Sequence, residues 1–179
     1  MAGRLERIRA TFQANGLGGF DFARSPDPAE LQAPSNRFLL EYWQSERGAD
    51  GSLPLVGAVD PVRLAPVLGR LLVVEPVDGG ADFRYRLYGS LTASFVNLEM
   101  TGKLLSAHPV GPEMVCFGMA LYRALMERPE PVLTTFIPAI ANYARWERLA
   151  LPFLGKDGSV RRFVVGNVPF GADGRELQG

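Results

Sequence analysis

This sequence of 179 residues has little cysteine, little histidine and no excess of either charge. It contains one cysteine and one histidine, and its 19 lysines and arginines balance 19 aspartates and glutamates. One cysteine excludes an internal disulfide and a cysteine-rich zinc site. A net charge of zero provides no general attraction for the phosphates of a nucleic acid. We therefore expect neither a metal site nor a nucleic-acid partner.

The sequence also lacks long apolar runs. A helix that spans a bilayer needs about 20 apolar residues in succession, and no segment comes near that length. The first residues, MAGRLERIRATF, carry charges at short intervals and have no apolar stretch of the kind found in a secretory signal. A single cysteine also suits a reducing compartment. These absences predict a cytoplasmic protein without membrane insertion.

Apolar residues are plentiful enough to form a packed core. They make up 47% of the chain against 21% charged residues, which is the balance of an ordinary globular protein. The length suits one domain with extensions. We expect an N-terminal helix and linker over residues 1–34, because residues 16–34 are rich in glycine, proline and aspartate. The domain then covers residues 35–170, followed by a frayed C-terminal tail at residues 171–179.

Two stretches have clear helical periodicity. Ser35 can cap a helix that carries an aromatic face and ends at Gly48. A longer helix begins at Gly111 and stops before Pro129, and its large apolar side chains recur on one side. Burying four such side chains contributes roughly 1.5–3 kcal/mol each. The long helix therefore needs a broad apolar surface, which a sheet provides most easily.

Five segments have the composition of antiparallel strands. They lie at residues 71–74, 82–88, 131–140, 143–154 and 160–168. β-Branched, aromatic and other apolar residues dominate them, and such residues favour strands. Asp-Gly or Gly-Gly pairs at 77–81 and 156–159 are typical of hairpin turns between neighbouring strands. The order of elements is strand, strand, short helices, long helix and three further strands.

Four segments resemble one known family in composition and order. They are FLLEYWQSERG, FRYRLYGS, MTGKLLS and ERLALPFLGKDGSVRRFVVG, which lie between residues 36 and 168. They resemble the PAS-like domains common in alphaproteobacteria, which are often short stand-alone proteins. The resemblance implies an α+β fold: a PAS-like five-stranded antiparallel sheet with short helices, one long helix on its concave face, and N-terminal helices packed outside. It also implies an internal pocket between the sheet and the long helix.

Residues that could perform catalysis or hold a cofactor are few. His108 could serve as a haem ligand, but proline follows it, and a polar loop residue is the simpler interpretation. Cys116 lacks the surrounding motif of a flavin photoreceptor, and we expect it to be a small buried side chain. No nucleophile-elbow sequence occurs, and the glutamates are scattered. We therefore predict no enzyme activity, no catalytic residue and no cofactor.

Two sets of residues are candidates for binding. The first would line the pocket, although the alternative is that its aromatic rings simply fill the core. Its members are Tyr85, Phe95, Asn97, Phe117, Leu121, Thr135, Phe136 and Phe153. The second would form a protein interface on the N-terminal aromatic helix, unless it covers the sheet of its own chain. Its members are Phe38, Leu39, Tyr42 and Trp43.

The predicted function is that of a stand-alone sensory or adaptor domain. It would bind a small ligand in the pocket, or a signalling partner protein, and pass on a change in packing by a population shift. We expect a homodimer through the N-terminal helix. One alternative is a small α+β cone-type enzyme acting on a small apolar molecule, which requires a polar dyad with shifted pKa values in the cavity. Another is a pure dimerisation module.

Overall fold

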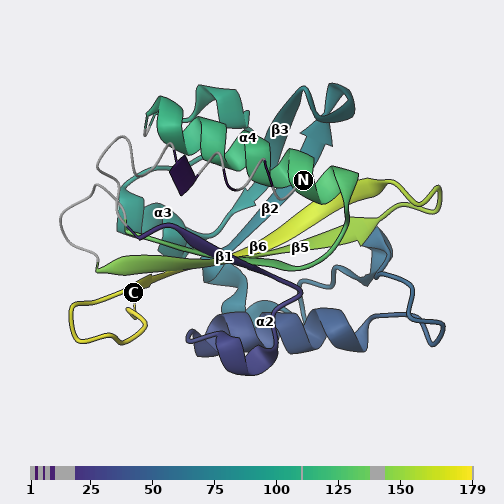
Figure 1. Ribbon diagram of the computed structural model, residues 1–179, viewed down its shortest axis with the longest axis horizontal. Helices are drawn as coiled ribbons and strands as arrows, with labels where there is room; N and C mark the ends of the chain where they lie inside the picture. The colour runs from purple at the N-terminus through teal and green to yellow at the C-terminus, as the bar shows by residue number, and fades with distance from the viewer. Residues whose placement is uncertain are drawn as a thin grey trace.

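One antiparallel sheet lies in the middle of the molecule, with helices on both faces (Figure 1). The computed structural model describes residues 3, 6, 9, 10, 19–109, 111–137 and 144–178. Within these residues, six strands form the sheet in the order β1-β4-β5-β6-β2-β3, and all neighbours are antiparallel. The strands are β1 (Asp21–Arg24), β2 (Leu71–Val77), β3 (Asp82–Tyr88), β4 (Val132–Phe136), β5 (Arg145–Leu154) and β6 (Val160–Phe170).

Helices lie on both faces of the sheet. The α-helices with defined bounds are α2 (Pro34–Ser45), α3 (Ser90–Val96) and α4 (Pro112–Glu127). Figure 1 shows α4 across one face and α2 across the opposite face. Short 3-10 turns are η1 (Pro28–Glu30), η2 (Val56–Ala58), η3 (Ala65–Arg70), η4 (Asp78–Gly80) and η5 (Leu105–Ala107). This arrangement confirms the predicted α+β fold, with its antiparallel sheet, its long helix over one face and an N-terminal helix outside.

The alternation of side chains along β5 divides the interior into two cores. Trp146 and Ala150 lie in the core beneath α4, whereas Leu149 lies in the core beneath α2. Successive side chains of a strand point to opposite faces, so a central strand between two layers of helix needs apolar residues at nearly every position. Two consecutive charged residues in the middle of β5, Glu147 and Arg148, are therefore exceptions that require an explanation.

Five of the strands occur where the sequence predicts them. The strands β2 to β6 overlap the five predicted segments, and β2 and β3 pair through the turn at η4, as expected. Residues 138–140 and residue 143, for which strands are also predicted, lie outside the described residues. The aromatic helix begins at Pro34 with Ala33 as its N-cap residue, so Ser35 lies inside the helix and is not its cap.

The strand β1 corrects the prediction of a linker over residues 16–34. It pairs with β4 at the edge of the sheet, with Asp21 opposite Thr135. The ring of Phe20, just before the strand, lies 5.5 Å from that of Phe117 on α4. Four residues are too few to show an alternating pattern, and their pairing depends on a strand far away in the sequence. Residues 16–18 and most of the predicted N-terminal helix lie outside the described part of the chain.

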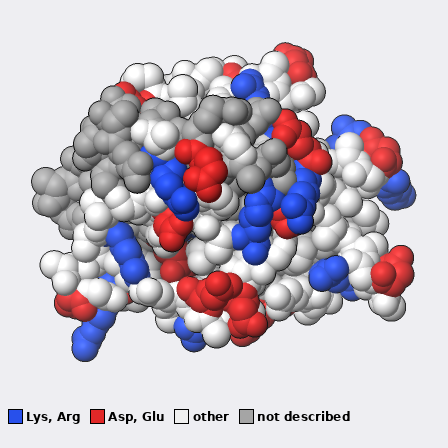
Figure 2. Space-filling view, viewed as in Figure 1, with Lys and Arg blue, Asp and Glu red and all other residues white. Residues whose placement is uncertain are grey.

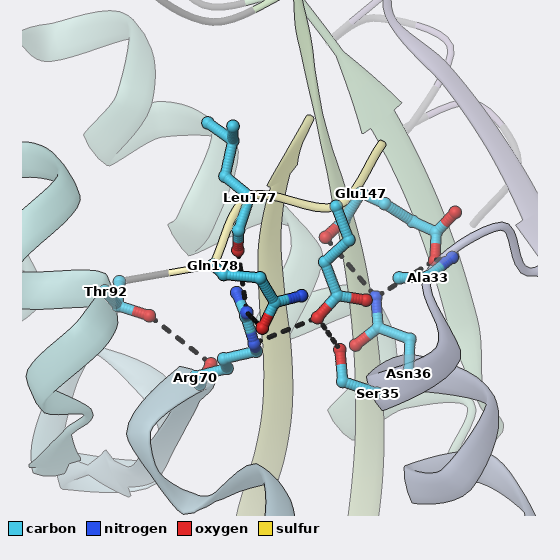
Figure 3. A network of polar contacts seen from close by, with 9 residues as sticks. Ala33, Ser35, Asn36, Arg70, Thr92, Glu147, Leu177 and Gln178 are labelled. Carbon is cyan, nitrogen blue, oxygen red and sulfur yellow. Dashed lines mark hydrogen bonds and ion pairs between the residues drawn. The ribbon is translucent and has the colours of Figure 1, made fainter. Parts of the chain in front are cut away.

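Glu147 on β5 binds the segment that leads into α2 (Figure 3). Its carboxylate accepts hydrogen bonds from the backbone N–H groups of Gln32 at 2.9 Å and Ala33 at 3.1 Å. It also accepts one from Nδ2 of Asn36 at 3.1 Å. Glu147 is only 1% exposed, so its charge is neutralised by these donors and by the start of the helix rather than by water. The first of the two exceptional charges on β5 therefore has a structural role.

The C-terminal segment folds back onto the molecule, which corrects the prediction of a frayed tail. The backbone N–H of Leu177 donates to the carbonyl oxygen of Pro169 at 3.0 Å. Nε of Arg70 pairs with Oε1 of Glu176 at 2.9 Å, and the hydroxyl of Ser35 donates to the same oxygen at 3.0 Å. This buried ion pair joins η3, the start of α2 and the C-terminal segment (Figure 3). Residue 179 lies outside the described residues.

Candidate functional site

Arg148 is a half-buried charge on the face of the sheet that α4 covers. Its guanidinium carbon lies 5.2 Å from the ring centroid of Phe117 on α4 and 5.4 Å from that of Phe136 on β4. Its Nε donates a hydrogen bond to Oδ1 of Asn167 on β6 at 3.0 Å. Two aromatic rings and one amide oxygen therefore hold the guanidinium group in place.

A row of three polar residues crosses three neighbouring strands at this point. Thr134 of β4 lies opposite Arg148 of β5, which in turn lies opposite Asn167 of β6. The hydroxyl of Thr134 donates to the backbone carbonyl oxygen of Arg148 at 3.3 Å. Thr134 and Asn167 are both buried. Polar side chains are unfavourable within an apolar core unless they have hydrogen-bond partners. A row of three such residues in the core beneath α4 is therefore a candidate functional site.

Three tyrosine side chains, two from β3 and one from α4, lie close to Arg148. The rings of Tyr85 and Tyr88 are 5.3 Å apart in an edge-to-face contact. Burial raises the pKa of Tyr122 to about 12, and it also raises the pKa of Tyr85 and of Tyr88. The positive charge of Arg148 opposes this effect in all three, but burial is the larger influence. The three phenols are therefore neutral. None of the described residues forms a hydrogen bond with their hydroxyl groups.

His108 lies beside the tyrosines, in the loop after η5, and its side chain is half-buried. Its ring centroid is 6.2 Å from that of Tyr85. Burial, with a smaller contribution from the charge of Arg148, lowers the pKa of His108 from 6.5 to about 4. At neutral pH the imidazole is therefore uncharged, with one donor and one acceptor nitrogen.

We call this group of side chains the Arg148 cluster. Its members are Arg148, Thr134, Asn167, Tyr85, Tyr88, Tyr122 and His108. Among the residues that the structure describes, no carboxylate forms an ion pair with Arg148, and no three potential metal ligands lie together. The cluster can bind a molecule through hydrogen bonds.

Five of the predicted pocket residues lie in this same core. Tyr85 belongs to the Arg148 cluster, and the rings of Phe117 and Phe136 flank the guanidinium group. Leu121 is fully buried one turn after Phe117 on α4, and Phe95 of α3 packs against the edge of the core. The structure places these five in one core, and two of them contact a charge that the sequence does not mark as part of a site.

The other three predicted pocket residues lie elsewhere, which corrects that part of the prediction. Phe153 is buried in the core beneath α2. Thr135 follows Thr134 on β4, so strand alternation directs its side chain toward the α2 face as well. Asn97 is exposed and ends α3 in a left-handed conformation with a φ of 49°. The face that a residue occupies depends on the register of its element, which the composition of a segment does not reveal.

The helix face predicted as a protein interface is buried within its own chain. Leu39, Tyr42 and Trp43 of α2 are at most 6% exposed. The indole Nε1 of Trp43 donates to the carbonyl oxygen of Pro152 at 2.9 Å, which ties the helix to β5. These three side chains therefore cover the sheet of their own chain, which is the alternative to a protein interface that the sequence analysis left open. Phe38 is half-exposed and lines a surface hollow of about 350 Å³.

Cys116 is exposed on α4, which corrects the prediction of a buried side chain. The helix turns Phe117 and Leu121 toward the sheet, and both are fully buried. A residue adjacent to Phe117 along a helix points about 100° away from it, so Cys116 faces outward.

The sequence gives little indication of the polar row. Arg148 directly precedes the apolar stretch at 149–153, and Asn167 interrupts the one at 163–170. Charged and amide residues in strands usually face solvent, and so such an interruption is not distinctive by itself. The pairing of β4, β5 and β6 is what places Thr134 beside them.

Charges of both signs are interspersed on the face shown in Figure 2, without a large area of one sign. Exposed ion pairs also occur in the protein, such as that of Arg161 with Asp157 at 2.6 Å. That face therefore offers no basic stripe that would follow a nucleic-acid backbone. Among the described helices, none is long and apolar enough to cross a membrane.

The fold is an antiparallel sheet with a long helix across one face, and the Arg148 cluster lies between the two. A family model described as a PAS domain matches residues 31–165, which is more than half of the chain. The chain therefore belongs to the PAS domain family, whose members are sensory and signalling modules.

Two further points follow from the comparisons. The match begins before α2 and ends within β6, so β1 lies outside it. The division of the chain at residues 34 and 170 stays a prediction. Searches of the curated proteins and of the solved structures gave no match.

Proposed function

We propose that this chain is a non-catalytic sensory module that binds a small molecule between α4 and the sheet. The observation that carries the proposal is the Arg148 cluster, in which a cation has one amide partner but no carboxylate partner among the described residues, and three tyrosine hydroxyls lie near it. A guanidinium group has five N–H donors, and a phenol can both donate and accept a hydrogen bond. A few polar groups set in an apolar core are what a small-molecule site needs to orient its ligand.

The position of the cluster suits the transmission of a signal. Phe117 contacts the guanidinium group of Arg148 on one side and the ring of Phe20 on the other. A molecule bound at Arg148 therefore acts directly on α4, and through it on the edge of the sheet where β1 begins. If the ligand favours one arrangement of α4 over another, its binding shifts the population toward that arrangement. A signalling partner protein, or a second copy of the chain, then recognises the change.

The oligomer and its location are parts of the same proposal. A homodimer through the N-terminal region would use surfaces other than Leu39, Tyr42 and Trp43, because these are buried in their own chain. The half-exposed Phe38 beside its surface hollow is the part of the predicted interface that is accessible. An exposed thiol at Cys116 suits a reducing compartment and therefore a cytoplasmic protein.

The second candidate function is a small α+β enzyme, and His108 is the observation in its favour. Its lowered pKa and its contact with Tyr85 are features that active sites often have. A general base works best when its pKa lies near the operating pH, and a pKa of about 4 makes His108 a weak base at neutral pH. This low basicity favours binding over catalysis.

The test is a thermal-shift screen of the full chain against a broad library of charged and neutral metabolites. We expect at least one compound to raise the melting temperature in a saturable manner. A Tyr122→Phe variant keeps the buried ring but removes one hydroxyl, and it should bind that compound roughly threefold to tenfold more weakly. If no compound stabilises the chain, or if a stabilising compound is turned over, the proposal is wrong.

A further inference from the structure

We infer that the molecule bound at this site carries a carboxylate group that pairs with Arg148. The inference rests on the proposed function, because it names the chemistry of the ligand that the sensory module would bind. A guanidinium group has five N–H donors. In Arg148 only the donor at Nε is used, by Asn167, and no described residue accepts a hydrogen bond from the two terminal nitrogens.

The charge balance of the site points to an anion. Half-burying a guanidinium group between two aromatic rings removes much of its water, and the rings offset only part of that loss. The usual solution in proteins is a carboxylate partner, as Arg162 has in Glu75 and Arg70 has in Glu176. Arg148 has no such partner among the residues that the structure describes. A ligand carboxylate supplies the missing charge.

The geometry favours a carboxylate over other anions. The two rings and Asn167 hold the guanidinium group in position, so that its terminal nitrogens are presented together, and a planar carboxylate can accept from both at once. Neutral hydroxyl groups such as that of Tyr122 can donate to the remaining lone pairs. Arg148 is also the one positive charge, among the described groups, that acts on Tyr85, Tyr88 and His108. A single positive charge matches a monocarboxylate, whereas a phosphate dianion calls for more than one.

The surroundings also constrain the rest of the ligand. Phe117, Phe136, Leu121 and the edge of Phe95 are apolar, and they belong to the same core as the cluster. A small monocarboxylic acid with an apolar body satisfies both parts of the site. We therefore choose benzoate as the probe, with benzamide as a neutral compound of the same shape and inorganic phosphate as a different anion.

The experiment is a calorimetric titration of the full chain with each of the three probes. We expect benzoate to bind saturably, and benzamide and phosphate to bind roughly tenfold more weakly or not at all. In Arg148→Met the side chain still packs on the two rings but carries no charge, and it should lose roughly tenfold or more of the benzoate affinity. The matched control is Arg161→Gln, which removes the same charge from the exposed β5–β6 hairpin and should leave the affinity unchanged.

A spectroscopic readout keeps the test valid if Arg148→Met does not fold. Bound benzoate should shift the Nε–H resonance of Arg148 in the unmodified chain and raise the pKa of His108, because it neutralises a charge that lowers that pKa. Arg148→Lys, which retains the charge without the planar fork, should bind benzoate at an intermediate strength.

Three outcomes would overturn the inference. Equal binding of benzamide and benzoate would show that the site does not select charge, and would leave the sensory function intact. Tighter binding of phosphate would replace the carboxylate with another anion. No binding of benzoate, together with stabilisation by a neutral compound in the library screen, would reject the anionic ligand alone. Failure of the entire library would reject the proposed function itself.

Discussion

Glu147 and Arg148 are consecutive residues of opposite charge, and β5 directs them to opposite faces of the sheet. Glu147 accepts hydrogen bonds from Gln32, Ala33 and Asn36 and is satisfied within the protein. Arg148 has one hydrogen bond from its side chain and no carboxylate partner among the described residues. The two residues therefore differ in role, one fixing α2 to the sheet and the other forming a site. Substitutions should separate these roles.

Glu147→Ala should destabilise the fold without removing the binding site. It leaves three donors without their acceptor, two of them buried, so we expect a loss of about 3 kcal/mol in the free energy of unfolding. Urea denaturation measures this loss. Glu41→Ala removes an exposed carboxylate from α2 and should change the free energy by less than about 0.5 kcal/mol. Equal urea midpoints for the two variants would contradict the structural role of Glu147.

His108 should make stability depend on pH between about 6.5 and 4. Its pKa is about 4 in the folded chain and 6.5 as its ordinary value, so the unfolded chain takes up a proton first as the pH falls. The stabilisation is therefore complete above pH 6.5 and is lost as the pH falls toward 4. The melting temperature of His108→Gln, measured from pH 7.5 to 4, should decline less steeply than that of the unmodified chain. Parallel declines would contradict the assigned pKa.

At the scale of elements, close approach between α2 and β6 decides how the helix packs. Gly166 of β6 lies directly beneath the buried side chain of Asn36, and a Cβ atom at position 166 would lie 1.9 Å from Oδ1 of Asn36 and 3.1 Å from Cδ2 of Leu39. Asn36 is 1% exposed and is held by Glu147, so it cannot move aside. The absence of a side chain at Gly166 is what allows α2 to lie flat on the sheet.

Gly166→Ala should therefore separate α2 from the sheet. Overpacking of this kind typically costs about 1–3 kcal/mol, and we expect the upper part of that range in urea denaturation. The control is Gly57→Ala, because a Cβ atom at Gly57 meets nothing within 4 Å. Trp43 fluorescence should also change in the Gly166 variant, since its indole is fixed between α2 and β5. Unchanged stability and fluorescence would show that the helix has more room than the structure indicates.

At the scale of the whole molecule, the C-terminal segment closes the α2 side of the fold. The ion pair between Arg70 and Glu176 joins elements from the beginning, middle and end of the chain, and both side chains are at most 10% exposed. Within the described part of the chain, Oε2 of Glu176 and Nη1 of Arg70 have no hydrogen-bond partner. The pair is therefore favourable only while both partners are present.

Glu176→Gln should leave the charge of Arg70 buried and unpaired. Breaking a buried pair from one side typically costs about 3–5 kcal/mol, and the position near the chain end places the expected loss at the lower limit. Arg161→Gln, which breaks an exposed ion pair, should cost less than about 1 kcal/mol. Chemical denaturation of both variants tests the contrast. Equal losses would mean that the C-terminal segment does not contribute to the cooperative fold.

The sequence by itself determined the elements and the family of this protein. Apolar periodicity and turn residues mark α2, α4 and the strands β2 to β6, because such patterns act over a few neighbouring residues. The tertiary structure alone decided the sixth strand, the burial of the aromatic face of α2, and the polar row through Arg148. Strand β1 exists only because β4 pairs with it, and Thr134 meets Arg148 and Asn167 only through strand register. Local patterns do not specify contacts between distant segments, so only the folded chain brings the residues of the Arg148 cluster together.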